Sequence, residues 1–319
     1  MRKISPLMSF PIGYFYGFVR VGSQTRLVIA SSNMKLLMFE RAGGPPEAGV
    51  LATSGSEIIP LAGAGVTCLY SLIQGGAAAL DKVKAFASTA SARVALDAVR
   101  ILAPIHRPPK FICIGLNYRD HAIESNMAIP EIPTVFNKFP SVVIGPGDNI
   151  VLPPMSEKPD YEAEFAFIIG KKGKHIKGEN WRDYVYGYTN VNDVSARDIQ
   201  LKGTTQWLMG KSFDTFAPMG PYLVTADEVP DPHNLSVKMT LNGEIMQNGT
   251  TRELIFNIPQ LLEYLSSVVT LEPGDVVSTG TPPGVGMAKK PNPIFLKPGD
   301  HCIVEVEGLG QLHNPVVGE

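Results

Sequence analysis

The sequence lacks paired cysteines, unbalanced charge and long apolar runs. Its three cysteines (Cys68, Cys113 and Cys302) are scattered without a CxxC pair, so there is no thiolate metal signal and a reducing compartment is favoured over secretion. A net charge of -2 gives no electrostatic case for binding nucleic acid or an anionic membrane. The apolar run from Met8 to Val19 is too short for a membrane-spanning helix and contains proline and glycine. We therefore expect small molecules or a second copy of the chain as partners.

Acidic residues are absent before Glu40, whereas the same segment holds several basic residues and many serines. This composition suits a transit segment that directs a protein to an organelle. The alternative is an extension that precedes a fold beginning near Met34. Both interpretations of residues 1–33 remain open, and the expected location is mitochondrial or cytoplasmic.

The whole chain of 319 residues has the composition of a soluble globular protein, with 44% hydrophobic and 18% charged residues. Short strand-like segments at 36–40, 48–53 and 57–61 are broken by glycine and proline. An alanine-rich segment without either residue predicts a helix over 78–99. These features predict a small β-plus-helix module over residues 34–105, which ends in a proline-rich boundary.

Residues 106–319 have a different pattern, in which short strands alternate with Gly-Asp and Pro-Gly turns. A buried strand is expected at 110–116, a turn and short helix at 117–126, and an amphipathic helix at 258–270. Regular alternation of strands and helices is missing, which argues against a doubly wound parallel sheet. The pattern predicts a β-rich α+β domain.

Two glutamates in "DYEAEFAFIIG" (160–170) stand one residue apart on a predicted strand. Alternate side chains of a strand share a face, so Glu162 and Glu164 point the same way and repel each other. A hard divalent cation such as Mg²⁺, Mn²⁺ or Ca²⁺ would neutralise them, with Asp193 as the natural third ligand. The alternatives are an edge strand that faces solvent and an aspartate that caps a turn.

Other residues have both a catalytic and a structural interpretation. His121 and Glu124 are three apart, so the carboxylate can orient the imidazole as a general base, or the two form a solvated surface pair. Lys211 follows apolar residues and can lie in a cleft facing an anionic substrate, or extend to the surface. The loop "STGTPPGVG" (278–286) offers backbone amides to a carboxylate, or is a plain connection.

Together these motifs carry a specific resemblance. "GLNYRDHAIE", "DYEAEFAFIIG", "NDVSARDIQ", "WLMGKSFDTFAPMGP" and "TGTPPGVG", in this order, strongly resemble the fumarylacetoacetate hydrolase family over about residues 105–319. "LLMFERAGGPPEAGVLA" is similar to the small N-terminal module of its shorter members. The resemblance implies a catalytic domain of the mixed β-roll type, a homodimer, and Mg²⁺ or Mn²⁺ in the site.

The resemblance also implies a metal site and a catalytic pair. It assigns Glu162, Glu164 and Asp193 as metal ligands. His121 and Glu124 match the family's HxxE pair, which often lies on a mobile lid.

Substrate contacts follow from the same resemblance. Lys211 matches the lysine near the anionic end of the substrate, and Arg197 and Gln200 match positions that contact substrate or position water. Gly280 and Thr281 match the loop that holds the substrate carboxylate. No position of these motifs is lost, which argues against a non-catalytic binding protein that retains the fold.

The implied chemistry is a metal-stabilised enolate formed from a small β-dicarbonyl or 2-oxo acid. Its outcomes are C–C bond hydrolysis of an acylpyruvate-like substrate or enol–keto tautomerisation of oxaloacetate. Decarboxylation of oxaloacetate and hydrolysis of a larger β-diketone are the alternatives. "KSFDTFAPMGP" with "FIIGKKGKHIK" most resembles the eukaryotic subgroup of oxaloacetate tautomerases.

Overall fold

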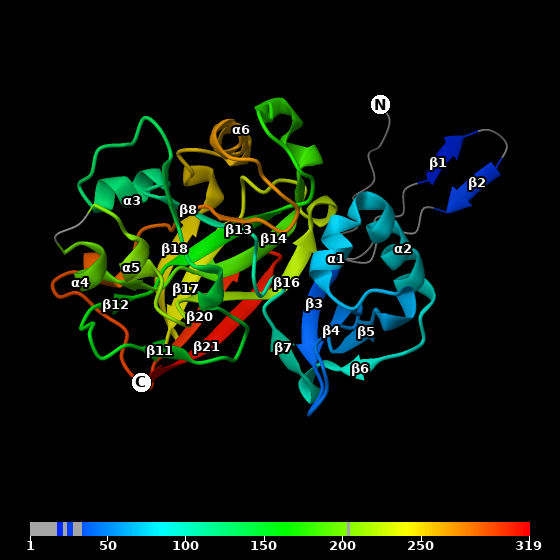
Figure 1. Ribbon diagram of the computed structural model, residues 1–319, viewed down its shortest axis with the longest axis horizontal. Helices are drawn as coiled ribbons and strands as arrows, with labels where there is room; N and C mark the ends of the chain where they lie inside the picture. Colours follow the sequence, from blue (N-terminus) through cyan, green and yellow to red (C-terminus); the bar gives the residue numbers. More distant parts are fainter. Residues whose placement is uncertain (1–17, 22–23, 28–33, 203–204) are drawn as a thin grey trace, which may run out of the picture. The chain divides into compact units, whose positions relative to one another are not determined.

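The computed structural model describes residues 18–21, 24–27, 34–202 and 205–319 (Figure 1). Strands β1 (Phe18–Val21) and β2 (Gln24–Leu27) pair antiparallel as a separate hairpin. Residues 34–319 form a compact unit of their own. The transit-segment prediction falls largely on residues outside the described ranges, so it stays a prediction.

Residues 34–102 contain five strands and two α-helices. They are β3 (Lys35–Glu40), β4 (Glu47–Leu51), β5 (Glu57–Pro60), α1 (Leu69–Gln74), α2 (Gly76–Thr89), β6 (Val94–Ala95) and β7 (Arg100–Leu102). The strands predicted at 36–40, 48–53 and 57–61 are therefore present, within one or two residues at each end.

The rest of the chain is dominated by strands. The strands are β8 (Phe111–Gly115), β9 (Thr134–Asn137), β10 (Val143–Ile144), β11 (Ile150–Leu152), β12 (Pro159–Asp160), β13 (Ala163–Ile169), β14 (Val185–Asn192), β15 (Ser195–Ala196), β16 (Ala217–Thr225), β17 (Ser236–Leu241), β18 (Glu244–Thr250), β19 (Val276–Ser278), β20 (His301–Val306) and β21 (Gly310–Gly318). The α-helices are α3 (Arg119–Glu124), α4 (Arg197–Gln200), α5 (Leu208–Lys211) and α6 (Ile258–Val268).

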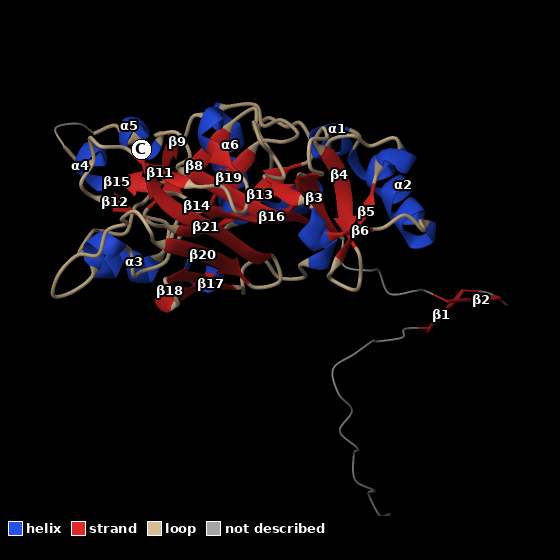
Figure 2. Ribbon diagram, turned by 90° about the horizontal axis from the view of Figure 1, so that it is seen from below, coloured by secondary structure: helices blue, strands red, loops and turns tan. Residues whose placement is uncertain are grey.

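A mixed twelve-stranded sheet forms the centre of this unit. Its strands follow the order β6-β5-β4-β3-β16-β14-β13-β19-β8-β9, with β10 and β7 at its sides. A five-stranded sheet, β11-β21-β20-β17-β18, stacks on it (Figure 2). Because β3 of the N-terminal module pairs with β16, both parts of residues 34–319 share one sheet. The predicted boundary near residue 105 stays a prediction.

Strand β13 is buried on both faces, as its apolar sequence predicts. Phe165, Phe167 and Ile169 face the core between the two sheets. Ala166 and Ile168 face a second core that includes residues of β3 and α1. Glu164 shares the face of Ala166, so the acidic residues lie at the start of a strand with no solvent-exposed side. An edge strand that faces solvent is therefore ruled out.

The helix predicted over 78–99 is too long. Helix α2 ends at Thr89, where the hydroxyl groups of Ser88 and Thr89 donate to carbonyls of the last turn. Beyond it, Val94 and Ala95 pair with β5. Sheet pairing thus overrides local helix propensity in this segment. The predictions at 110–116, 117–126 and 258–270 are confirmed by β8, α3 and α6.

Helix α2, with 14 residues, is the longest described helix. No helix in the described ranges is both long and apolar enough to span a bilayer.

Close packing of β14 against β16 predicts that Gly187→Ala destabilises the protein. An added Cβ would lie 2.3 Å from the Val224 carbonyl oxygen, a backbone atom that cannot rotate away. We expect a loss of about 1–3 kcal/mol of unfolding free energy, measured by chemical denaturation. Gly44→Ala is the control, because its Cβ would meet no atom closer than 3.5 Å. Equal stability of the two variants would contradict this packing.

Candidate active site

A cavity of about 350 Å³ lies where β13 begins and where α3, α4 and α5 approach the sheet. Its apolar wall includes Phe136 and Trp207, whose rings meet edge to face at 5.4 Å. Eight of the ten predicted site residues line it: His121, Glu124, Glu162, Glu164, Arg197, Gln200, Lys211 and Thr281. The structure therefore brings together residues that are up to 160 positions apart in the sequence.

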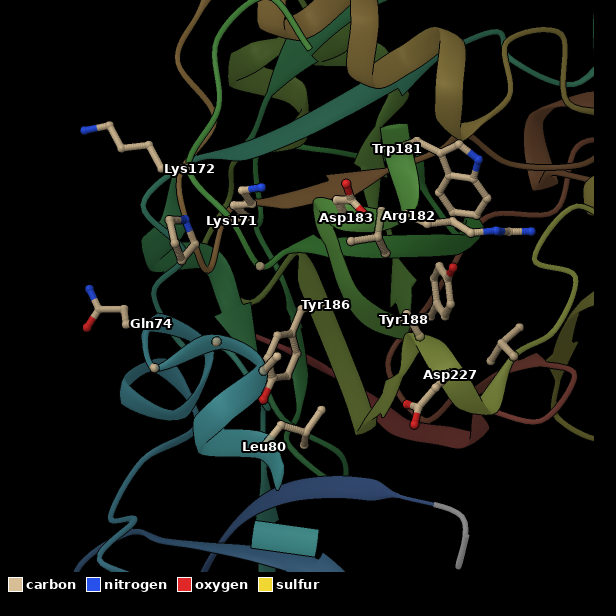
Figure 3. A pocket seen from close by; sticks show the side chains of 18 of the residues that line it. Gln74, Leu80, Lys171, Lys172, Trp181, Arg182, Asp183, Tyr186, Tyr188 and Asp227 are labelled. Carbon is tan, nitrogen blue, oxygen red and sulfur yellow. The ribbon is translucent and has the colours of Figure 1, made fainter. Parts of the chain in front are cut away.

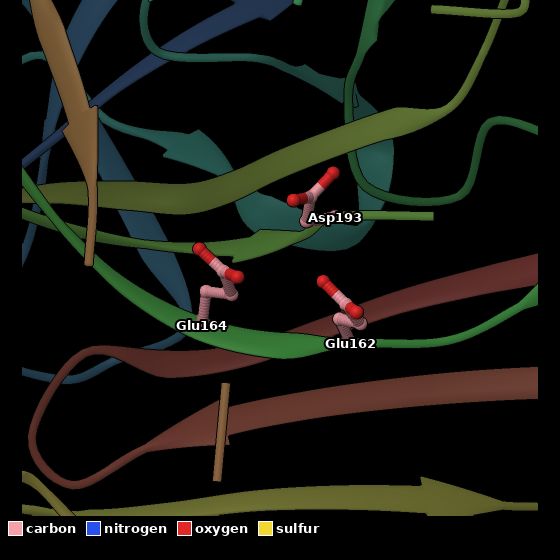
Figure 4. Close-up of side chains that lie close together, drawn as sticks. All are labelled: Glu162, Glu164 and Asp193. Carbon is pink, nitrogen blue, oxygen red and sulfur yellow. The ribbon is translucent and has the colours of Figure 1, made fainter. Parts of the chain in front are cut away.

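The three predicted metal ligands converge in one place (Figure 4). One carboxylate oxygen from each of Glu162, Glu164 and Asp193 lies within 4.8 Å of the others, and all three side chains are buried. Strand pairing explains the convergence. Ala163 pairs with Asn192, so the residues just outside this pair meet, and the Asp193 N–H donates to the Glu162 carbonyl at 2.9 Å.

Two of the predicted substrate-binding cations contact this cluster. The Lys211 ammonium lies 2.7 Å from Glu162 Oε2 and 2.8 Å from Asp193 Oδ2. The Arg197 guanidinium lies 2.7 Å from Glu162 Oε1. Burial alone would lower the pKa of Lys211, but the carboxylates of Asp193 and Glu162 raise it above its usual value. The two ion pairs therefore stabilise the charged form of Lys211.

Lys138, just after β9, is a third cation beside the acidic cluster, and it was not predicted. Its fully buried ammonium lies 2.6 Å from Asp193 Oδ1 and donates to the Val194 carbonyl at 3.0 Å. Asp193 thus has a lysine on each carboxylate oxygen, Lys138 on one and Lys211 on the other. The only sequence signal was a lysine set between phenylalanines in "VFNKFP", which is typical of no motif.

The two glutamates of the cluster differ in electrostatic state. Burial opposes ionisation of Glu162, but Lys211 and Arg197 lower its pKa to about 2. Burial and the neighbouring charges of Asp193 and Glu162 raise the pKa of Glu164 well above its usual value. Glu164 accepts hydrogen bonds from the Ser278 hydroxyl and the Gly280 N–H. The three cations pair with Glu162 and Asp193, so Glu164 is the carboxylate of the cluster that has no cation beside it among the described residues.

These residues fit a hard divalent cation. All three candidate ligands are carboxylates, the donors that Mg²⁺ and Mn²⁺ prefer, and neither cysteine nor histidine is among them. Burial, and then the charges of Asp193 and Glu162, raise the pKa of Glu164, which is expected for a buried carboxylate without a cation beside it. A bound cation would supply that charge.

His121 and Glu124 form a pair that is attached to the loop 278–286. His121 Nδ1 lies 3.1 Å from Glu124 Oε2, and the Gly284 N–H donates to the same carboxylate at 3.1 Å. Burial alone would raise the pKa of Glu124, but these two hydrogen bonds lower it overall. A carboxylate that accepts from Nδ1 leaves Nε2 as the nitrogen able to exchange a proton.

The loop residues have unequal positions. Thr281 lines the cavity, and its hydroxyl donates to the Ala163 carbonyl while accepting from Gln247. The N–H of Gly280 donates to Glu164 at 3.1 Å. Gly280 therefore supports a candidate metal ligand, which leaves Thr281 as the member of this pair that faces the cavity.

Asp160 is a second residue that the sequence analysis missed. It is fully buried, and its Oδ2 accepts from Arg197 Nε at 2.9 Å and from the Met287 N–H at 3.0 Å. Its Oδ1 accepts from the Gly286 N–H at 2.7 Å and from that of Tyr161 at 2.9 Å. One carboxylate thus connects α4 to the end of the loop 278–286 and fixes the orientation of Arg197, which also donates to Gln200 at 3.0 Å.

Comparison with known proteins agrees with this architecture. Residues 110–317 match the family model described as fumarylacetoacetate (FAA) hydrolase C-terminal. The chain is 45% identical over 290 residues to mitochondrial oxaloacetate tautomerase fahd2 of Xenopus laevis, covering 89% of this chain and 91% of that protein. The chain therefore belongs to the fumarylacetoacetate hydrolase family, and it is an enzyme of that family.

Solved structures show the same fold. Fumarylacetoacetate hydrolase from Exiguobacterium antarcticum matches with a TM-score of 0.79 and 38% identity, over 90% of this chain and 100% of that one. Maleylpyruvate hydrolase from Sphingobium sp. SYK-6, solved in complex with manganese(II) and pyruvate, matches with a TM-score of 0.75 and 31% identity, over 89% and 99%. The predicted β-rich α+β fold of this family is confirmed.

The raised pKa of Glu164 predicts that Mn²⁺ binding strengthens as pH rises. Below that pKa the carboxyl holds a proton that the metal must displace, so affinity should increase by up to about tenfold per pH unit and then level off. Calorimetric titration with Mn²⁺ in buffers of different ionisation enthalpy would measure the released proton. Glu164→Gln should bind at least roughly tenfold more weakly. Affinity that does not change with pH would disprove the interpretation.

The contacts of Asp160 predict that Asp160→Asn raises KM for a 2-oxo acid by on the order of tenfold. An amide keeps one acceptor oxygen, so either Arg197 or the loop loses its partner. Steady-state kinetics would measure the change. Asp198→Asn, next to Arg197 on α4, is the control, because Asp198 binds Ser156 outside the cavity. Similar KM values for both variants would rule out the orienting role of Asp160.

Proposed function

We propose that this protein is an oxaloacetate tautomerase that depends on Mg²⁺ or Mn²⁺ and interconverts the enol and keto forms of a small 2-oxo acid. The main support is the acidic cluster of Glu162, Glu164 and Asp193 in the same cavity as the His121–Glu124 pair. A relative named oxaloacetate tautomerase, which matches over 89% of the chain, supports the choice of substrate.

The metal, held by Glu162, Glu164 and Asp193, would polarise the 2-oxo group and stabilise negative charge as the enolate develops. Lys211 and Arg197 place positive charge beside the same carboxylates, where the anionic end of the substrate would bind. The ion pairs of Lys211 with Glu162 and Asp193 favour its charged form, so we assign the proton transfer to a different residue.

His121 is the residue best placed to move the proton. Glu124 holds Nδ1, so Nε2 can accept a proton from the substrate or return one to C3. Loss of the enol proton and delivery of a proton to C3 leave the composition of the substrate unchanged. The reaction therefore needs no water, and the contact of Glu124 with Gly284 keeps α3 close to the loop 278–286 during the transfer.

C–C bond hydrolysis is the second candidate. Gln200 lines the cavity, and Arg197 fixes its side-chain oxygen at 3.0 Å, so its amide can hold a water. A structural relative is named maleylpyruvate hydrolase. Decarboxylation of oxaloacetate and hydrolysis of a larger β-diketone use the same polarised carbonyl and are alternatives that product analysis can separate.

We further propose a mitochondrial location and assembly as a homodimer. The Xenopus laevis relative is named as mitochondrial, and the basic, serine-rich start of this chain agrees with that location. The homodimer rests on the family resemblance.

An ultraviolet assay with Mg²⁺ or Mn²⁺ tests the proposed reaction. We expect loss of enol-oxaloacetate absorbance without release of pyruvate. Pyruvate together with a carboxylic acid from acetylpyruvate would instead indicate hydrolysis, and pyruvate with CO₂ from oxaloacetate would indicate decarboxylation. Either result as the principal activity would overturn the tautomerase proposal.

His121→Ala tests the assignment of the base. We expect kcat to fall by about 10²- to 10⁴-fold because proton transfer loses its carrier. Mn²⁺ affinity should stay unchanged, since His121 is not part of the carboxylate cluster. His106→Ala is the control, because this exposed histidine lies outside the cavity. Turnover that survives His121→Ala would show that another group carries the proton.

A further inference from the structure

The loop 278–286 packs closely against strand β18 (Glu244–Thr250). A Cβ added to Gly284 would lie 2.2 Å from the Met246 carbonyl oxygen. A Cβ added to Gly249 would lie 2.4 Å from the Cβ of Pro282. Strand and loop therefore approach so closely that neither position has room for a side chain. No family motif includes a residue of β18, yet this strand supports the loop.

Gln247 connects β18 to the loop through its side chain, which is buried. Its Oε1 accepts from the Ala163 N–H at 2.9 Å. Its Nε2 donates to the Thr281 hydroxyl at 2.8 Å and to the Pro282 carbonyl at 2.7 Å. Because an N–H only donates and a carbonyl only accepts, these partners fix the orientation of the Gln247 amide. Both of its hydrogens are used.

The side chain of Gln247 takes the place of a main-chain partner near the end of a sheet. Strand β19 pairs with β13 over Ala166–Ile168, and Ala163 lies outside this paired range. The Gln247 amide binds the N–H of Ala163, and the Thr281 hydroxyl binds its carbonyl. Buried backbone groups need such partners. Gln247 and Thr281 together therefore hold the start of the strand between the two glutamates of the acidic cluster.

These contacts also fix the hydroxyl of Thr281. It donates to the Ala163 carbonyl at 2.9 Å and accepts from Gln247. Rotation of the Thr281 side chain would break both bonds and leave buried polar groups without a partner. Thr281 lines the candidate active site. Gln247 therefore determines how Thr281 is placed relative to a molecule in that cavity.

We propose that Gln247 is a positioning residue for substrate binding and acts through Thr281. Gln247 does not line the cavity, so it would not contact the substrate itself. It would hold the part of the loop where the substrate carboxylate binds. This inference rests on the proposed function, with a 2-oxo acid as substrate, and on the carboxylate-binding role that the family resemblance implies for Thr281.

Oxalate binding in saturating Mn²⁺ tests this role without depending on turnover. Oxalate resembles the enolate of a 2-oxo acid, and calorimetric titration of the full chain measures its Kd. Gln247→Met keeps the length of the side chain but cannot donate to Thr281 or Pro282. We expect the Kd of oxalate and the KM for enol-oxaloacetate to rise about tenfold, as for loss of one hydrogen bond. The kcat should change by less than about threefold, because Gln247 contacts neither member of the His121–Glu124 pair.

A double-mutant cycle shows whether Gln247 acts through Thr281. Thr281→Val removes the hydroxyl, so adding Gln247→Met to it should change the Kd of oxalate by less than about twofold. A general loss of stability would instead weaken binding equally with and without the hydroxyl. Circular dichroism identifies a variant that does not fold. Gln247→Glu then replaces Gln247→Met, because it still accepts from Ala163 while its ionised carboxylate cannot donate to Thr281.

Two controls make similar substitutions elsewhere. Gln74→Met replaces an exposed glutamine that lines a separate cavity of about 1000 Å³ (Figure 3). That cavity shares no lining residue with the candidate active site. Asn248→Met replaces the exposed neighbour of Gln247 on β18. Both controls should bind oxalate within about twofold of the wild-type chain.

The possible outcomes separate this inference from the proposed reaction. Unchanged oxalate affinity in Gln247→Met, or an equal loss with and without Thr281→Val, would overturn the positioning role alone. A wild-type chain that binds oxalate but does not tautomerise oxaloacetate would overturn the reaction alone, and the oxalate data would still decide the role of Gln247. A wild-type chain that binds no oxalate in the presence of Mn²⁺ would overturn both.

Discussion

Balancing buried charge at the start of β13 is the constraint on which the rest of the site depends. Glu162, Glu164 and Asp193 meet in buried positions, where solvent screens their charges much less than at the surface. Lys138, just after β9, and Lys211, at the end of α5, neutralise part of that charge by pairing with Asp193. Because a buried carboxylate without a partner is strongly unfavourable, β9, α5 and the β13–β14 pair must all be in place together. The buried charges are therefore balanced only when these segments are correctly folded against one another.

The sequence predicted the parts of the site that depend on local periodicity. Glu162 and Glu164 share a face because side chains alternate along a strand, and His121 meets Glu124 because both lie on one helical turn. The convergence of Asp193 depends on the pairing of β13 with β14, which cannot be derived from either strand alone. The residues offered Asp193 as a third ligand or as a turn cap, and the family resemblance chose the ligand.

Other features had no usable sequence signal. Lys138 is an isolated lysine, and Asp160 is the first residue of "DYEAEFAFIIG" but has no role assigned by that motif, so only the folded chain shows their contacts. The helix predicted over 78–99 was too long for the opposite reason. The sequence has a strong helix propensity there, but Val94 and Ala95 pair with β5 instead. The strand-rich architecture was predictable, whereas the sharing of one sheet through β3 and β16 was not.

The bond from the Gly284 N–H to Glu124 has a consequence for substrate choice. It ties the orientation of His121 to close contact between α3 and the loop 278–286. A substrate large enough to separate these two segments would also break the contact that orients the Glu124 carboxylate, which in turn orients the His121 imidazole. Such a compound could bind and still not react. The enzyme can therefore select substrates by size because a large one disturbs His121, even where the cavity is wide enough to admit it.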